Sequence, residues 1–411
     1  MKYPFQPEIL DAMPEELAEL YRELEIKLLQ EIASRLKAAG KLNEVTVQDI
    51  RALRSHGIKL GGIKKAIRET TGMSSAELNK LLDDVVKRNQ AYYTDLITLA
   101  KVTEPETLVD ANEIAAIRRQ TWSAMRNLTQ SMGFLEVVGG RLTLLSPAKA
   151  YQWALDNAVM QVQSGAISYS QAIANATRQL ADSGLKTVYY EPKEDGSNPH
   201  YDQIDVAVRR AVLTGVNQIC DKYTEQSMEY LGTPYVEVSA HSGARDKPYP
   251  NMWSSHKAWQ GKVYYQSKNG ERDPMGRYQD LVEVTGYGEV DGLCGVNCHH
   301  NRHPFIPGIM ERTYTDEELA NIDPPDFEYE GRKYTHYEAT QKQRQIERTI
   351  RKLKRRVAAA TNEEDEQAAR IKSSRLSEKY HEFSKAAGLR EQRERMNVYI
   401  AGGWNERQSS N

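Results

Sequence analysis

The amino-acid sequence predicts an α+β fold with a predominantly helical N-terminal region, a compact loop-rich mixed domain and a long charged C-terminal helix. Three observations support this prediction. Apolar residues recur at helical spacing over most of residues 14–230. Five of the nine histidines and two of the three cysteines then fall between residues 241 and 303. Finally, residues 336–396 contain no proline, few apolar residues and alternating charges.

Length and composition set the first limits on organisation. A chain of 411 residues predicts two or three folding units. We expect a helical region over 1–200, a mixed domain over 201–325 and a charged helical extension over 326–411. The formal net charge of −2 gives no general attraction to nucleic acid, so DNA contact would require a local basic patch.

The small number of cysteines and the lack of long apolar segments indicate the cellular compartment. Three cysteines are too few to cross-link so long a chain, which is typical of a reducing compartment. No apolar run approaches the ~20 residues of a membrane span, and the first residues lack the apolar core of a signal peptide. We therefore expect a protein without a membrane segment that stays in the cytoplasm, or in a particle assembled there.

Hydrophobic periodicity locates the elements that precede the cysteine-containing region. It predicts helices over residues 14–39, 74–100, 113–132, 148–163, 168–184 and 202–230. An interrupted helical stretch capped by Thr46 should end near Gly72, and Ser74 should open the helix that follows. Alternation around a Gly-Gly turn predicts a hairpin within 134–145, and strands are expected over 186–190 and 235–240.

The C-terminal region is expected to be a long solvated helix from His336 to about Met396, with a break at residues 360–362. Such helices usually remain in solvent or pair with another helix. The first half is strongly basic, however, and phosphate contact with double-stranded DNA is an alternative use. The residues that would make this contact are Arg344, Arg348, Arg351, Lys352, Lys354, Arg355 and Arg356.

The most informative motifs lie between residues 237 and 308, which we call the signature region. They include Ser-His-Lys-Ala-Trp-Gln-Gly-Lys-Val-Tyr, Thr-Gly-Tyr-Gly and Gly-Leu-Cys-Gly-Val-Asn-Cys-His-His, followed by Pro-Phe. The spacing of the glycines predicts tight turns and close backbone approach, in a loop-built site held by the strand that ends near residue 240. The signature residues are His241, Arg245, His256, Trp259, Gln260, Gly261, Thr285, Gly286, Gly288, Cys294, Asn297, Cys298 and His299.

This order of motifs resembles phage minor capsid protein 2, and it is more distantly similar to the head morphogenesis domain of Mu-type phages. A weaker part of the resemblance lies upstream, over residues 209–217. The resemblance implies a low-copy structural protein of a tailed-bacteriophage virion, in the head interior or at the portal vertex. It would bind the portal protein or the major capsid protein, and it would help head assembly, DNA packaging or DNA ejection. No enzymatic activity is implied.

Three chemical accounts of the motif cluster stay open from the residues alone. One is structural zinc, because Cys294 and Cys298 have knuckle-like spacing. His241, His256, His299 or His300 could complete a tetrahedral set. A second account is a metal-dependent nuclease packaged in the head, in which a histidine activates water. That account lacks an acidic residue at position 255 beside the upstream histidine.

The third account is structural, and we favour it. Buried loop backbone must find hydrogen-bond partners, and His, Arg, Trp and Cys side chains are well suited to provide them. In this account Trp259 is a core anchor, and Arg245 holds backbone carbonyls or an acidic partner through its planar guanidinium.

Overall fold

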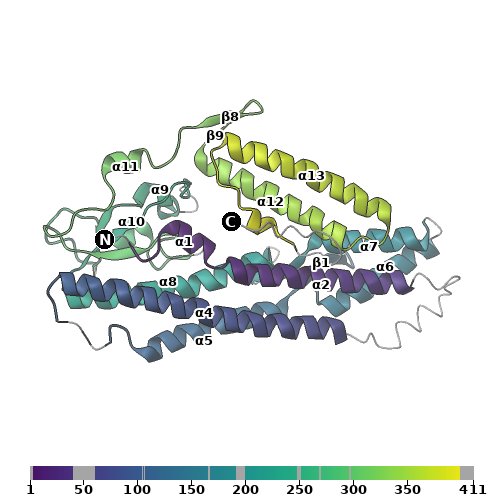
Figure 1. Ribbon diagram of the computed structural model, residues 1–411, viewed down its shortest axis with the longest axis horizontal. Helices are drawn as coiled ribbons and strands as arrows, with labels where there is room; N and C mark the ends of the chain where they lie inside the picture. Colours follow the sequence, from purple (N-terminus) through teal and green to yellow (C-terminus); the bar gives the residue numbers. More distant parts are fainter. Residues whose placement is uncertain are drawn as a thin grey trace, which may run out of the picture. The chain divides into compact units, whose positions relative to one another are not determined.

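The computed structural model describes residues 3–39, 61–103, 105, 107–164, 167–190, 200–247, 251–267, 270–295 and 298–398. Within these residues the chain is mostly helical and carries three small antiparallel sheets, which confirms the predicted α+β class (Figure 1). The cap expected at Thr46 and the signature residue Asn297 lie outside the described residues. None of the helices in the described part combines the length and apolar character that a membrane crossing requires.

The helices before residue 232 follow the predicted periodicity, except that the first of them was not predicted. They are α1 (Pro7–Ala12), α2 (Glu15–Ala39), α4 (Gly61–Leu99), α5 (Ala111–Ser131), α6 (Pro147–Gln163), α7 (Tyr169–Ser183) and α8 (Ile204–Leu231). The start predicted at Ser74 is wrong, because α4 runs through this position without a break. Ser74 is buried and its hydroxyl donates to the carbonyl of Thr71, 3.1 Å away, so the helix itself satisfies the polar group.

Three sheets are formed by short strands. The first has the order β2-β1-β3-β4, from β1 (Gly133–Val138), β2 (Arg141–Leu145), β3 (Leu185–Tyr190) and β4 (His200–Gln203). The second has β5 (Tyr235–Val238) between β6 (Val263–Tyr265) and β7 (Arg302–Phe305). The third pairs β8 (Phe327–Tyr329) with β9 (Arg332–Tyr334). The predicted hairpin and the strands β3 and β5 are confirmed, whereas β4, β6, β7, β8 and β9 were not expected.

Contacts divide the chain into two compact units, each assembled from three stretches of sequence. The first unit is Met1–Pro14, Ser75–Met125 and Arg209–Lys342. The second is Glu15–Ser74, Arg126–Val208 and Gln343–Asn411. The first unit therefore contains the whole signature region, together with α1, the second sheet and the short helices α9 (His256–Trp259), α10 (Leu281–Thr285) and α11 (Asp316–Ala320).

The C-terminal region is a pair of helices, α12 (His336–Ala358) and α13 (Glu363–Ala386). The break expected at residues 360–362 is confirmed, and the side chain of Asn362 caps α13 by accepting from the backbone N–H of Asp365 at 2.8 Å. The two helices lie antiparallel (Figure 1), because Tyr380 donates to Glu347 at 3.0 Å and Gln343 donates to Ser384 at 3.0 Å.

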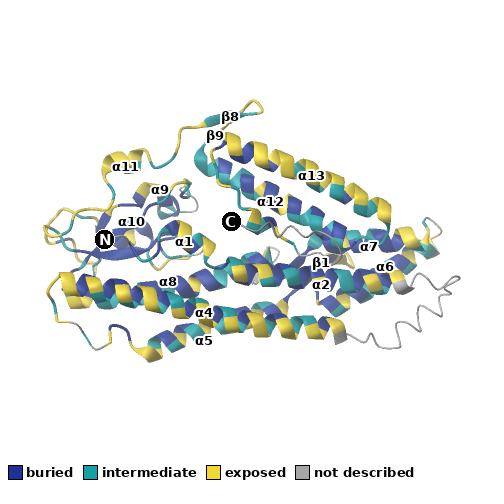
Figure 2. Ribbon diagram, viewed as in Figure 1, coloured by how far each residue is buried: buried dark blue, intermediate teal, exposed yellow. Residues whose placement is uncertain are grey.

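The expectation that this region is solvated is wrong for α12. Figure 2 shows buried residues along α12 as well as exposed ones. The buried apolar side chains recur at helical spacing and are Ala339, Ile346, Ile350, Leu353 and Val357. The sequence pattern was misleading because many basic residues lie between these apolar positions and give the helix a polar composition.

Most of the basic side chains of α12 make contacts within the second unit. Arg351 forms an ion pair with Asp205, and both Arg356 and Lys352 pair with Asp182, at 2.5 and 3.4 Å. Arg355 pairs with Glu25 at 3.5 Å and also donates to the carbonyl of Ala181 at 2.8 Å. Lys354 donates to the carbonyl of Met396 at 2.8 Å.

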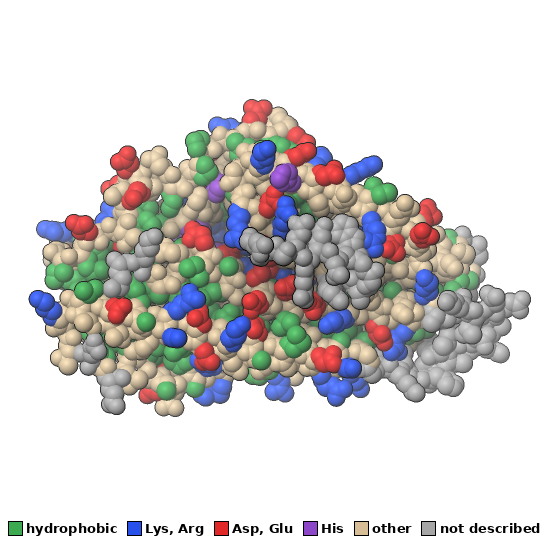
Figure 3. Space-filling view, in the orientation of Figure 1, with side chains coloured by type: hydrophobic (Ala, Val, Ile, Leu, Met, Phe, Trp, Pro, Cys, Tyr) green, Lys and Arg blue, Asp and Glu red, His purple; other side chains and the backbone are tan. Residues whose placement is uncertain are grey.

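Charges of both signs are also mixed on the surface. Figure 3 shows Lys and Arg side chains interspersed with Asp and Glu on the face in view. Of the seven basic residues predicted to touch DNA, Arg348 is the one classed as exposed, and Arg344, Arg351, Lys352, Lys354, Arg355 and Arg356 are partly or fully buried.

Replacing Arg355 by Ala should lower the free energy of unfolding by about 3 kcal/mol or more, because it leaves Glu25 buried without its cation. The matched control is Arg348→Ala, which removes the same side chain from an exposed position on the same helix. The control should change stability by less than about 0.5 kcal/mol. Chemical unfolding followed by circular dichroism measures both, and equal effects would contradict the buried pairing of Arg355.

Candidate functional site

The signature region is built around the buried strand β5. This strand pairs antiparallel with β6 and with β7, so it has no free edge. Successive residues of a strand point to opposite faces of the sheet. Val236 and Val238 pack with Trp259, Leu281, Leu293 and Cys298, whereas Tyr235 packs with Val263, Tyr265 and Phe305. Both faces are covered, which explains why every residue of β5 is buried.

Asp291 ties the loop that precedes α9 to the loop that precedes β7. Its carboxylate accepts hydrogen bonds from the side chains of Asn251 (3.4 Å), Trp253 (3.1 Å) and Ser254. Burial raises the pKa of Asp291, but these hydrogen bonds, with that of Ser254 foremost, outweigh burial and hold the pKa below its ordinary value. The ionised carboxylate is therefore part of the folded loop.

The backbone carbonyl of Asp291 is the second point of attachment. It lies 3.0 Å from Nε2 of His256 and 3.5 Å from a guanidinium nitrogen of Arg245. Arg245 also contributes its own carbonyl, which accepts from the backbone N–H of Lys257 at 3.0 Å. These contacts are the carbonyl-holding roles expected of His and Arg side chains.

The Trp-Gln motif joins a core anchor to a hydrogen-bond bridge. Trp259 is 1% exposed and donates its indole N–H to the carbonyl of Trp253 at 2.8 Å. The side-chain oxygen of Gln260 accepts from the backbone N–H of His241 at 3.0 Å and from Nε2 of His300 at 2.9 Å. Gln260 thus links the end of β5 to the start of β7, and Trp259 is the core residue that the sequence predicted.

The glycines of the later motifs are required by close packing. Gly286 ends α10 with φ of 59°, and a Cβ there would lie 2.5 Å from the ring of Trp253. A Cβ on Gly292 would lie 1.9 Å from the carbonyl oxygen of Gly286. Thr285 closes the same turn, since its hydroxyl donates to Leu281 at 2.6 Å and its carbonyl accepts from Leu293 at 2.9 Å.

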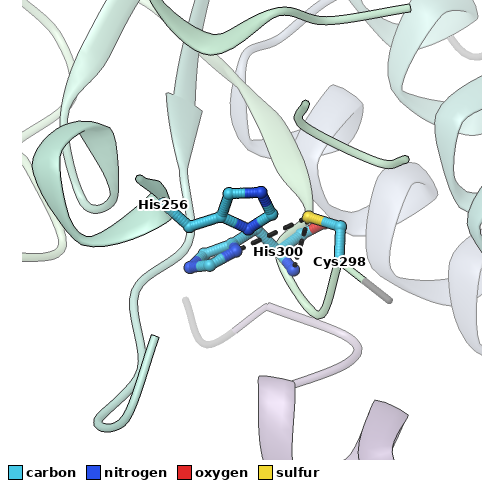
Figure 4. Close-up of side chains that lie close together, drawn as sticks. All are labelled: His256, Cys298 and His300. Atoms are coloured by element: carbon cyan, nitrogen blue, oxygen red, sulfur yellow. Dashed lines mark hydrogen bonds between the residues drawn. The ribbon is translucent and has the colours of Figure 1, made fainter. Parts of the chain in front are cut away.

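His256, Cys298 and His300 converge in the interior of this unit (Figure 4). One potential ligand atom from each of the three lies within 4.8 Å of the others. Nδ1 of His300 is 3.5 Å from Sγ of Cys298, and the exposed fractions of the three residues are 2%, 1% and 0% in the order named. Two imidazoles and a thiol therefore share a site that is closed to solvent.

The metal set predicted from sequence is only partly brought together. Cys298 and His256 meet His300, which was one of the alternative histidines, whereas Cys294 and His241 are not in this group. Cys294 adopts a left-handed backbone conformation, with φ of 60°, and its sulfur lies 3.7 Å from the carbonyl of His300. The ring of His241 lies beside that of His300, with centroids 4.5 Å apart, and its Nδ1 contacts the carbonyl of Ser242 at 2.9 Å.

The adjacent pair His299 and His300 have different environments. His300 is fully buried, whereas Nε2 of His299 is 3.8 Å from a carboxylate oxygen of Asp11. Consecutive side chains of an extended segment point to opposite sides, so only one of the two can enter the interior. Spacing alone could not identify which of them does.

Burial determines the ionisation state of the three converging side chains. It lowers the pKa of His256 to about 4 and the pKa of His300 well below its ordinary value. Burial also raises the pKa of the Cys298 thiol to about 11. At neutral pH, and with no cation bound, the three side chains are therefore uncharged.

Sequence reasoning missed a second polar cluster on the same sheet. Glu237 of β5 is buried and accepts from the backbone N–H and the hydroxyl of Thr313, both at 2.7 Å, and from the hydroxyl of Tyr3. The ring of Tyr3 stacks on His303, with centroids 3.7 Å apart. The signal that could have revealed the cluster is a lone Glu in an otherwise apolar strand.

Arg302 forms the other contact network that the sequence did not reveal. It is 1% exposed, and it donates to Asp221 at 2.7 Å, to Gln266 at 2.5 Å and to the hydroxyl of Tyr287 at 2.6 Å. Its guanidinium also lies over the ring of Tyr287, 4.4 Å from the centroid. The tyrosine of the Thr-Gly-Tyr-Gly turn therefore connects that turn to β7 and α8.

Comparison with known proteins places the chain among the structural proteins of bacteriophage particles. A family model described as phage minor capsid protein 2 matches residues 5–385, and the chain belongs to this family. A curated relative named "Structural protein", from Lactococcus phage LL-H, is 22% identical over 330 residues. The alignment covers 78% of this chain and 79% of that relative. No solved structure matches.

The similarity thus extends far beyond residues 237–308, where the sequence resemblance was strongest. The expectation of a minor capsid, structural protein of the phage virion is confirmed by the family match and by the relative.

Replacing Gly292 by Ala should destabilise the first unit by about 1–3 kcal/mol, because the new methyl group would force the backbone of the Gly286 turn to move. The control is Gly72→Ala in α4, where a Cβ meets no atom within 4 Å. That change should stabilise the helix by up to about 1 kcal/mol. Opposite signs in thermal unfolding are expected, and a neutral Gly292→Ala variant would refute the close packing of the turn.

Acid should destabilise the protein through buried His303, whose pKa burial lowers to about 3. The unfolded chain binds this proton near pH 6.5 and the folded chain does not, so stability is lost as the pH falls from about 6.5 towards 3. The loss is about 1.4 kcal/mol per pH unit for this residue. Urea unfolding at several pH values gives the slope of the unfolding free energy against pH. In the His303→Gln variant this slope should be smaller by the amount that corresponds to about one proton. An unchanged slope would show that His303 does not titrate in this way.

Proposed function

We propose that this minor capsid protein acts in the interior of the phage head or at the portal vertex, in few copies per particle. It binds the portal protein or the major capsid protein, and it helps head assembly, DNA packaging or DNA ejection. The family assignment supports a role in the virion. The burial of the three converging side chains His256, Cys298 and His300 supports a structural role for this site over a catalytic one.

The rival function, a metal-dependent nuclease packaged in the head, fits this site poorly. A hydrolytic metal needs an open coordination position that the substrate can reach. His256, Cys298 and His300 are at most 2% exposed, so a phosphodiester could not approach them without unfolding the loops. The proposal therefore includes no enzymatic activity.

Packaged double-stranded DNA stays in the proposal as a further partner, with Arg348 as the phosphate contact best supported on α12. Arg351, Arg355 and Arg356 are engaged by carboxylates of the second unit, and breaking those pairs would carry a cost in stability. Charge reversal at these three positions would therefore unfold the helix pair and could not report on DNA. A single change at Arg348 is the cleaner probe.

Quantitative mass spectrometry of purified proheads and filled heads tests the proposal. The protein should occur in both, at far fewer copies than the major capsid protein, because an assembly role requires it before DNA enters. Chemical cross-linking in the same particles should join it to the portal or the major capsid protein. Absence from proheads, copy numbers equal to the major capsid protein, or cross-links to neither partner would overturn the proposal.

A further inference from the structure

We propose that His256, Cys298 and His300 bind a zinc ion in the interior of the first unit. This inference goes beyond the proposed role in the head and does not depend on it. The donor set consists of two imidazole nitrogens and one thiolate, which is a combination that zinc prefers. The three ligand atoms come from α9 and from the segment before β7, and they already lie within 4.8 Å of one another.

The separation between two of the proposed ligand atoms has the value that zinc requires. Zinc lies about 2.0 Å from nitrogen and about 2.3 Å from sulfur in tetrahedral sites, which places these two ligand atoms about 3.5 Å apart. Nδ1 of His300 and Sγ of Cys298 are 3.5 Å apart. A hydrogen bond from the thiol to Nδ1 has the same length, so the distance alone is not sufficient.

The outer contacts of the two histidines supply the second argument. Nε2 of His256 faces the carbonyl of Asp291 at 3.0 Å, and Nε2 of His300 faces the side-chain oxygen of Gln260 at 2.9 Å. Both oxygens are acceptors, so Nε2 carries the proton in each ring and Nδ1 keeps its lone pair. Metal-binding histidines are oriented in this way by their second nitrogen. Nδ1 is therefore the nitrogen with an available lone pair in both rings, and in His300 it is the nitrogen that lies 3.5 Å from Sγ of Cys298.

We assign the fourth ligand position to His241, which, like Cys294, is not among the side chains whose ligand atoms lie within 4.8 Å of one another. Its ring is adjacent to that of His300, and the carbonyl of Ser242 engages Nδ1, so Nε2 is the nitrogen left for a metal. Because the three main ligands are buried, the zinc would be structural and would stabilise the fold. On binding, the thiol of Cys298 releases its proton to solvent and becomes a thiolate.

Elemental analysis of the full-length chain, expressed in zinc-supplemented medium and purified without a metal-affinity step, is the direct test. One zinc per chain is expected. Replacement of zinc by cobalt should produce a thiolate-to-cobalt charge-transfer band. Cys298→Ser should abolish that band, and the matched control Cys294→Ser should keep both the band and the zinc, because Cys294 is not one of the proposed ligands.

Several results would overturn the proposal. They are wild-type protein that contains no zinc and takes up none, a folded Cys298→Ser variant that keeps the cobalt band, or a folded Cys294→Ser variant that loses the metal. If Cys298→Ser fails to fold, the unfolding temperature of the wild-type protein tests the proposal. A chelator should lower its unfolding temperature, and added zinc should restore it. An unfolding temperature that changes with neither chelator nor added zinc would also refute the zinc site.

Discussion

The need to satisfy buried backbone in an irregular segment governs the structure of the signature region. Between β6 and β7 the chain has only one short helix, α10, among its described residues, so strand ladders cannot provide most of the hydrogen bonds. The side chain of Gln260 accepts from the backbone N–H of His241, the ring of His256 bonds the backbone carbonyl of Asp291, and the carboxylate of Asp291 holds three further side chains in place. Loss of the Gln260 side chain or of the Asp291 carboxylate would leave two or three donors without their partner at once, which is why the motifs form one interdependent set.

The same constraint extends to the start of the chain. Tyr3 reaches the sheet through Glu237 and stacks on His303, while Arg209 of α8 donates to the carbonyl of Asp11 at 2.6 Å. The first unit is therefore completed by residues that lie more than two hundred positions before the strand they contact.

Sequence patterns predicted the long elements and the buried role of Trp259, because periodicity and composition report local preference and burial. They failed where the outcome depended on distant contacts. Ser74 resembles a helix cap, but burial within α4 overrides that preference. The basic residues of α12 suggested solvent or DNA, whereas Asp182 and Asp205 from other segments pair with several of them. For His300, the sequence gives no indication of which neighbouring histidine faces inward.

Native-state hydrogen exchange tests most directly whether the signature loops and the β5 sheet form one cooperative unit. The informative amides are Leu293, bonded to Thr285, and Lys257, bonded to Arg245, compared with Val238, whose N–H donates to Lys262. The account predicts that all three exchange with the same opening free energy, through unfolding of the whole unit. Exchange of Leu293 and Lys257 by local opening, at much lower free energy than Val238, would contradict it.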